Sequence, residues 1–197
     1  QFKNRSNLFY EKYYFKDTNN KIKEVFKKIS NKNIAAIKKF KTIKKLKFIE
    51  FPKLGLNELQ KIVKKINKLN GGLLLIDYGY LNSINKDTLQ SVMNHKKNKL
   101  LDNLGKADIT SLVNFKLLNE FFINNNLKVK KIVTQKFFLE KMGILERANI
   151  LSKNMSLKEK SSLYIRLKRL LDINLMGELF KVIFTYKSTK NNFLGFE

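Results

Sequence analysis

The sequence of 197 residues contains no cysteine and a single proline. The absence of cysteine excludes disulfide bonds and thiolate metal sites, and it is compatible with a reducing compartment. No apolar run approaches the roughly 20 residues that a membrane-spanning helix needs. The charged N-terminal residues are not followed by an apolar segment, so they do not form a signal peptide. We therefore expect no membrane insertion.

Acidic residues are scarce, and arginines are scarcer still. Sixteen acidic residues stand against 41 basic ones, which gives a formal net charge of +25 at pH 7. Such a charge often indicates a nucleic-acid partner. However, base readout and bidentate phosphate contacts favour arginine, whereas here nearly all basic residues are lysines. We therefore interpret the densest basic stretch, 38–47, as a solvated face in preference to a nucleic-acid groove.

The chain divides into an N-terminal segment, 1–49, and a longer C-terminal segment, 50–197. Its hydrophobic fraction of 43% is typical of a globular fold, and its length suits one domain with a real core. Two aromatic runs within 8–26 flank an Asn/Asp-rich turn and predict a β-hairpin. The Lys-rich region 27–49 is poorly patterned, and we expect an irregular arm that ends in a short strand.

Helical and strand patterns alternate from residue 50 onward, which indicates an α/β fold. Asn57 can cap a helix that runs to Leu69, and the strand Leu73–Ile76 follows. Because four consecutive apolar residues form this strand, we expect it to be buried on both faces of a helix-covered parallel sheet. Its carboxyl end, where such sheets bind ligands, carries Asp77, Tyr78 and Gly79.

A long polar loop then leads to a helix capped by Thr110 or Ser111, and a strand over 127–134 follows. Helical segments, one of them opened by a capping box at Ser156, separate that strand from a last one over 179–186.

Each polar residue of these segments can be interpreted either as structural or as functional. Asp77 can hold a cation or a neighbouring loop, or it can cap its own turn. His95 is the only histidine, which excludes a histidine metal site; a surface role is commoner for a lone histidine than a general base. Asp108 and Thr110 are explained as helix caps, and Gln90 is uninformative by itself. No Gly-rich strand–turn–helix element and no serine-hydrolase motif is present.

Several short phrases nevertheless occur in a specific order. They are Ile76-Asp-Tyr-Gly79, Asp87-Thr-Leu-Gln90 with His95, Gly105-Lys-Ala-Asp-Ile-Thr110, Thr134-Gln135 with Phe138-Leu139, Met142-Gly-Ile144, and Met176-Gly-Glu-Leu-Phe-Lys181. This series resembles the MidA-like family of class I S-adenosylmethionine-dependent methyltransferases, which includes mitochondrial complex I assembly factors. The resemblance covers residues 50–197 well and the hairpin before them more weakly.

The resemblance implies the C-terminal part of a Rossmann-like methyltransferase sheet, with an N-terminal hairpin and a helical insertion before the last strand. It implies methyl transfer to a protein, with arginine as the acceptor. In the complete enzyme, Asp77, His95 and Asp108 would be catalytic, and Tyr78, Gly79 and Gln90 would contact the substrate. No metal is implied.

The family's cofactor motifs lie upstream of the segments that match here, so the S-adenosylmethionine site is expected before Gln1. We therefore expect a fragment that alone neither binds the cofactor tightly nor turns over. The implied partner is a protein, such as a respiratory complex I subunit, in the bacterial cytoplasm or the mitochondrial matrix. The alternative from composition is a non-catalytic basic module that binds RNA or an acidic protein.

Overall fold

The computed structural model describes the backbone of all 197 residues and the side chain of each except Lys32. The chain forms two compact units, which we describe separately. The first comprises residues 1–58 and 82–120, and the second comprises 59–81 and 121–197. Two helices, α2 (Lys53–Leu69) and α3 (Phe115–Asn124), contribute residues to both units.

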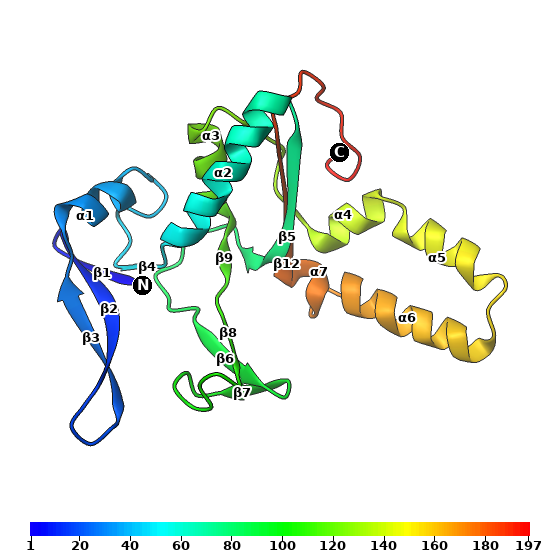
Figure 1. Cartoon of the computed structure of the whole chain (residues 1–197). Helices are drawn as coiled ribbons and strands as arrows, with labels where there is room; N and C mark the ends of the chain where they lie inside the picture. The colour runs from blue at the N-terminus through cyan, green and yellow to red at the C-terminus, as the bar shows by residue number, and fades with distance from the viewer. The chain divides into compact units, whose positions relative to one another are not determined.

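The first unit contains an antiparallel sheet in the order β3-β2-β1-β4. Its strands are β1 (Phe2–Arg5), β2 (Leu8–Lys16), β3 (Ile22–Lys28) and β4 (Phe48–Ile49). The β2–β3 pair confirms the predicted hairpin (Figure 1). Asp17 stabilises its turn, because one carboxylate oxygen accepts hydrogen bonds from the N–H groups of Asn19 and Lys21.

The prediction of an irregular arm over 27–49 is wrong for most of its length. The strand β3 continues to Lys28, and a helix, α1 (Asn31–Lys38), follows it. The side chains of Phe2, Phe9 and Ile37 are buried in the core of this unit. The helix is missed in the sequence because lysines interrupt its short apolar pattern.

The segment predicted as a long polar loop contains a second, smaller sheet. Its strands are β6 (Gln90–Met93), β7 (Lys96–Asn98) and β8 (Asp108–Thr110), paired antiparallel in the order β7-β6-β8. Asp108 and Thr110 therefore belong to a strand, and their prediction as helix caps is wrong. A two-residue strand, β9 (Val113–Asn114), precedes α3, and Asn114 Oδ1 caps this helix by accepting a hydrogen bond from the Leu117 N–H.

The second unit is built around two long strands, β5 (Gly72–Tyr80) and β12 (Phe180–Tyr186), which pair antiparallel over seven residues (Figure 1). The short strands β10 (Lys128–Val129) and β11 (Val133–Thr134) also pair antiparallel with β12. The strands predicted at 73–76 and 179–186 are thus confirmed, whereas the region predicted as one strand over 127–134 forms two short strands. The expected parallel pairing is wrong at these contacts, because β12 runs opposite to each neighbour.

The expectation that β5 is buried on both faces is also wrong. Leu74 and Ile76 each remain 42% exposed, whereas Val182 and Ile183 of β12 are fully buried. The helix before β5 starts at Lys53, directly after Pro52, and Asn57 lies inside it. Proline is favoured at a helix start because its fixed φ suits the first turn.

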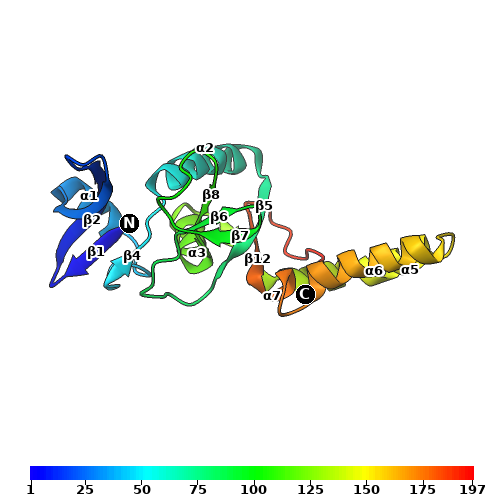
Figure 2. The same cartoon turned by 90° about the horizontal axis from the view of Figure 1, so that it is seen from below.

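The helical insertion before the last strand is confirmed. It consists of α4 (Gln135–Lys141), α5 (Ile144–Ser152), α6 (Leu157–Leu171) and α7 (Met176–Leu179), with α5 and α6 side by side as a helical hairpin (Figure 2). Ser156 and Glu159 form the predicted capping box. Among the described helices, none combines the length and apolarity that a bilayer-spanning helix requires.

Candidate functional site

Three of the predicted site residues, Asp77, Tyr78 and Gly79, lie within β5 of the second unit. Asp77 is exposed, and its Oδ1 accepts a hydrogen bond of 2.8 Å from the Tyr78 N–H. The pairing with β12 places Lys181 directly opposite Asp77. The Tyr78 ring contacts the Phe180 ring edge-on at 5.6 Å. One carboxylate oxygen of Asp77 therefore has a local structural role.

The other three residues lie on the small sheet of the first unit. Gln90 and Asp108 share one face, because Gln90 pairs with Thr110 and Asp108 pairs with Val92. The Gln90 amide donates a hydrogen bond of 3.2 Å to the Thr110 hydroxyl. This sheet therefore brings an amide, a hydroxyl and a carboxylate onto a single exposed face.

His95 lies at the two-residue turn that joins β6 and β7. Asn94 and His95 have φ values of +50° and +60°, the left-handed conformation that such turns require at both positions. The imidazole is exposed. The backbone position of His95 is thus explained by the turn, while its catalytic role stays a prediction.

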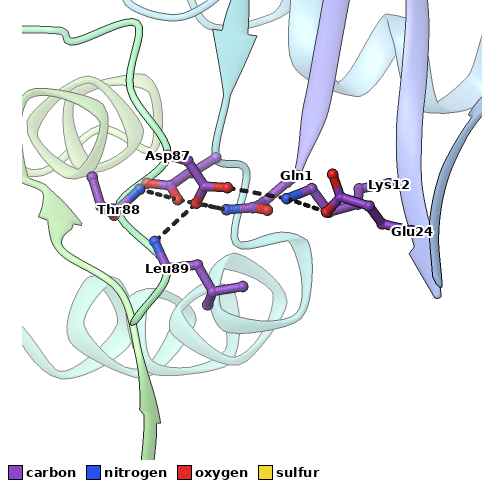
Figure 3. A network of polar contacts seen from close by, with 7 residues as sticks. Gln1, Lys12, Glu24, Asp87, Thr88 and Leu89 are labelled. Atoms are coloured by element: carbon purple, nitrogen blue, oxygen red, sulfur yellow. Dashed lines mark hydrogen bonds and ion pairs between the residues drawn. The ribbon is translucent and has the colours of Figure 1, made fainter. Parts of the chain in front are cut away.

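A polar cluster in the first unit was missed by the sequence analysis (Figure 3). Asp87 accepts hydrogen bonds from the Lys12 ammonium at 3.0 Å, the Gln1 amide at 2.5 Å and the Leu89 N–H at 3.0 Å. Lys12 also pairs with Glu24 at 3.3 Å. The cluster connects Gln1, which precedes β1, and the strands β2 and β3 with the segment around Asp87.

Glu50 extends this cluster by accepting two hydrogen bonds from Thr88, one from its N–H at 3.0 Å and one from its hydroxyl at 2.6 Å. The Thr88 hydroxyl in turn accepts a hydrogen bond from the Leu112 N–H. The phrase Asp87-Thr-Leu-Gln90 was a usable signal, but its partners are far away in the sequence. Because these groups bond to one another, the cluster is best explained as a structural junction.

The electrostatics of the cluster favour its charged state. Burial by itself would raise the pKa of Asp87, but hydrogen bonds from Lys12, Gln1 and Leu89 outweigh burial and lower it. Burial would likewise lower the pKa of Lys12, yet the contacts with Asp87 and Glu24 raise it. Both shifts stabilise the ion pair at neutral pH.

The described residues do not fit an S-adenosylmethionine cradle by themselves. A nucleoside cradle is typically built on a glycine-rich turn that leads from a strand into a helix. Gly71 and Gly72 instead lead from α2 into β5, and a Cβ at Gly72 would meet the Phe184 ring at 2.9 Å. Across the described side chains, no group of three or more possible metal ligands is arranged to hold an ion.

The fold is similar to that of two solved structures. Two solved structures of COG1565 superfamily proteins from Burkholderia thailandensis superpose with TM-scores of 0.80 and 0.78, at 17% and 16% sequence identity. Each superposition covers 98% of this chain, but only 53% and 51% of the respective solved chain. The second of these structures contains bound S-adenosyl-homocysteine.

Sequence comparison identifies the family. Residues 3–133 match the family described as "Putative S-adenosyl-L-methionine-dependent methyltransferase". The chain therefore belongs to this methyltransferase family, whose cofactor is S-adenosyl-L-methionine.

Named relatives agree with this assignment. The mitochondrial protein arginine methyltransferase NDUFAF7 of Xenopus tropicalis is 31% identical over 124 residues, which are 62% of this chain and 28% of the frog protein. The Danio rerio protein of the same name is 28% identical over 123 residues, 62% of this chain and 29% of the fish protein. The chain thus matches little more than a quarter of either relative.

Proposed function

We propose that this chain supplies the acceptor-side part of an S-adenosyl-L-methionine-dependent protein methyltransferase that modifies arginine. The family match over residues 3–133 is the observation that carries this proposal. The names of the frog and fish relatives support arginine in a protein as the acceptor. Those names also support a mitochondrial location, although a bacterial cytoplasm suits the cysteine-free chain equally well. A respiratory complex I subunit as the partner rests on the family resemblance alone.

We propose that the cofactor is bound mainly by the part of the methyltransferase fold that this chain does not cover in the superposition with the solved structures. Two observations support it. The described residues lack a glycine-rich cradle, and the chain corresponds to about half of the solved structures (53% and 51%). In this view β5, the strands beside it and β12 form the C-terminal part of a Rossmann-like sheet, with residues 1–49 as an appended hairpin segment.

We propose that Asp77 binds and orients the arginine side chain that accepts the methyl group. Methyl transfer from a sulfonium is an in-line displacement, so positioning of the acceptor dominates over covalent help. A carboxylate can hold and orient a guanidinium through charge-assisted hydrogen bonds. One oxygen of Asp77 accepts from the Tyr78 N–H, and the exposed side chain leaves the second oxygen for such a contact. The predicted roles of His95, Asp108, Gln90 and Gly79 rest on the family pattern alone.

The test is methyl transfer to protein substrate by the complete reading frame that contains these residues. We expect Asp77→Asn to reduce turnover by at least about tenfold, because it removes the charge that orients the acceptor. Affinity for S-adenosyl-homocysteine, measured by calorimetry, should stay unchanged. The matched control is Asp172→Asn, since Asp172 accepts a hydrogen bond from the Asn174 N–H in a similar local role. Full turnover of the Asp77 variant would show that this residue has only a structural role and would contradict the proposal.

Calorimetry on the 197-residue chain tests the placement of the cofactor. We expect no micromolar binding of S-adenosylmethionine by this chain alone, because among its described residues no glycine-rich turn leads from a strand into a helix. Micromolar affinity would show that the cofactor site lies within these residues and would contradict the proposed division of roles.

A further inference from the structure

Two adjoining hollows on the first unit form a groove, which we call the basic groove. The basic groove is lined by Lys3, Arg5, Lys44, Lys45, Lys47 and Phe48, with small polar residues of β1 and the β1–β2 turn between them. The hollows have volumes of about 500 and 310 Å³, and they share Arg5 and Lys47. Among the side chains that the structure describes, no carboxylate lines either hollow.

The loop that carries three of these lysines is fixed by side-chain acceptors. The Glu120 carboxylate accepts hydrogen bonds from the N–H groups of Lys41 and Thr42, at 2.6 and 2.9 Å. At the other end of the loop, Asn85 Oδ1 accepts a hydrogen bond of 2.7 Å from the Lys47 N–H. The wall of the basic groove is therefore pre-organised, which lowers the entropic cost of binding a ligand.

The charge of the basic groove selects an anionic ligand. Five cationic side chains surround a concave surface, and a concave surface of one sign concentrates the electrostatic potential. Like charges held this close repel one another, and an anion that enters the groove relieves the repulsion. The ligand should present several negative charges, because the cations line both hollows.

The aromatic rings beside the groove distinguish a protein from a nucleic acid. Single-stranded nucleic acids bind by stacking bases on open aromatic faces. Here the Lys3 ammonium lies 4.0 Å from the centroid of the Phe26 ring, and the Arg5 guanidinium lies 5.8 Å from that of Tyr10. Cations thus already occupy these rings, which leaves point charges as the main binding groups. Lysine ammonium groups act as point charges, and the carboxylates of an acidic peptide supply matching negative charges.

We propose that the basic groove docks an acidic segment of a protein partner. That the partner is the methylation substrate rests on the proposed function, whereas the anion-binding groove itself does not. Docking of such a segment would raise the affinity for proteins that carry it and would explain the concentration of lysine in 38–47. This proposal assigns a binding role to lysines of the stretch that we interpreted from the sequence as a solvated face.

The experiment measures binding of two labelled probes by fluorescence anisotropy at 50 and 200 mM NaCl. One probe is a peptide of twelve glutamates, and the other is a uridine 12-mer. The test variant is Lys44→Glu, Lys45→Glu and Lys47→Glu combined. The matched control reverses three exposed lysines of α2, Lys64, Lys65 and Lys68, with the same change in net charge.

We expect the affinity for the glutamate peptide to fall as the salt concentration rises. The groove variant should lower this affinity at least about tenfold, and the control variant should lower it less than about twofold. Equal losses in both variants would show attraction to net charge alone and overturn the proposal. Tighter binding of the uridine 12-mer, lost only in the groove variant, would overturn it in favour of RNA.

Folding of each variant is checked by circular dichroism. If the triple variant fails to fold, the single Lys45→Glu variant, at an exposed position, answers the same question. The assay contains no cofactor and measures no methyl transfer. A negative result here therefore leaves the proposed methyltransferase function standing, and failure of methyl transfer leaves the basic groove standing.

Discussion

The ion pair between Lys12 and Asp87 shows how the unequal burial of two partners determines how much the pair contributes to stability. The Lys12 side chain is 7% exposed, whereas that of Asp87 is 41% exposed. The lowered pKa of Asp87 stabilises the fold above its unfolded-state pKa, and this stability is lost as the pH falls through the lowered value. The raised pKa of Lys12 contributes stability below its unfolded-state pKa, and this is lost only at strongly alkaline pH.

A double-mutant cycle measures this pair. We expect Lys12→Met and Asp87→Asn each to lower the free energy of unfolding by about 0.5–1.5 kcal/mol, because each leaves a polar partner unsatisfied. The double variant should lose less than the sum by about 0.5–1 kcal/mol, a low value that reflects the solvent around Asp87. Urea unfolding at pH 7 gives these values. The cycle of Lys12→Met with Asp102→Asn serves as control, and coupling of equal size there would refute a specific pair.

Glu120 is a second carboxylate whose role depends on pH. Burial would raise its pKa, but hydrogen bonds from Thr42 and Lys41 lower it. Its contribution to stability is therefore present above the unfolded-state pKa of glutamate and is lost as the pH falls through the lowered folded value.

We expect Glu120→Gln to lower the free energy of unfolding at pH 7 by about 1–2 kcal/mol, because one oxygen and the charge that accepts two N–H groups are lost. The melting temperature should fall by roughly 2–6 °C for a chain of this size. The difference from the unsubstituted chain should shrink between about pH 5 and pH 3. Thermal unfolding followed by circular dichroism measures both. Glu140→Gln, at an exposed helical position, should change little, and a pH-independent loss would contradict this role for Glu120.

At the scale of elements, the patterns that the sequence reveals are those made by local contacts. The hairpin 8–26 was predicted because aromatic runs flank a turn whose Asp17 bonds to residues two and four positions away. The capping box at Ser156 is equally local. The strands of the small sheet, β6, β7 and β8, contain only three or four residues each, too few for a periodic pattern to stand out from a polar loop.

In the candidate site, too, the features made by local contacts could be predicted from the sequence, whereas those made by distant contacts could not. The sequence placed Asp77 at the carboxyl end of the strand Leu73–Ile76, whereas β5 continues through Asp77 to Tyr80. Its antiparallel partner β12 could not be derived from pattern, since the two strands are about a hundred residues apart and their pairing depends on tertiary packing. The Asp87 cluster was invisible for the same reason, because Gln1 and Lys12 lie 86 and 75 residues from Asp87.

Gly177 allows α7 to lie close to the C-terminal end of α6. The residue is buried, and a Cβ at this position would overlap the backbone carbonyl of Leu171. We expect Gly177→Ala to lower the free energy of unfolding by about 1–3 kcal/mol, because the backbone of both segments must shift. Gly71→Ala is the control, since nothing lies within 4 Å of a Cβ there. Urea unfolding compares the two, and equal stability of both variants would refute the close contact at Gly177.

For the molecule as a whole, the excess of lysine provides positive charge for the proposed binding of an anionic partner, but it also lowers the stability of the folded state. With 41 basic and 16 acidic residues, most cations have no acidic partner to neutralise them. Lys12 forms ion pairs with Glu24 and Asp87, and Lys23 forms one with Asp17, and both lysines belong to the β2–β3 hairpin. Self-repulsion should therefore destabilise the folded state wherever the cations are concentrated, above all around the basic groove.

Salt provides a direct measurement of this repulsion. The screening length falls from about 30 Å at 0.01 M to about 8 Å at 0.15 M salt, so added salt should relieve repulsion between exposed lysines. We expect the melting temperature to rise by a few degrees between 10 and 150 mM NaCl, a range too dilute for general salting-out effects to dominate. The Lys44→Glu, Lys45→Glu and Lys47→Glu variant should show a smaller rise, because each substitution replaces a cation by an anion where the charges are densest. A melting temperature that is constant or falls over this range would show that the folded state tolerates its net charge of +25 without measurable repulsion.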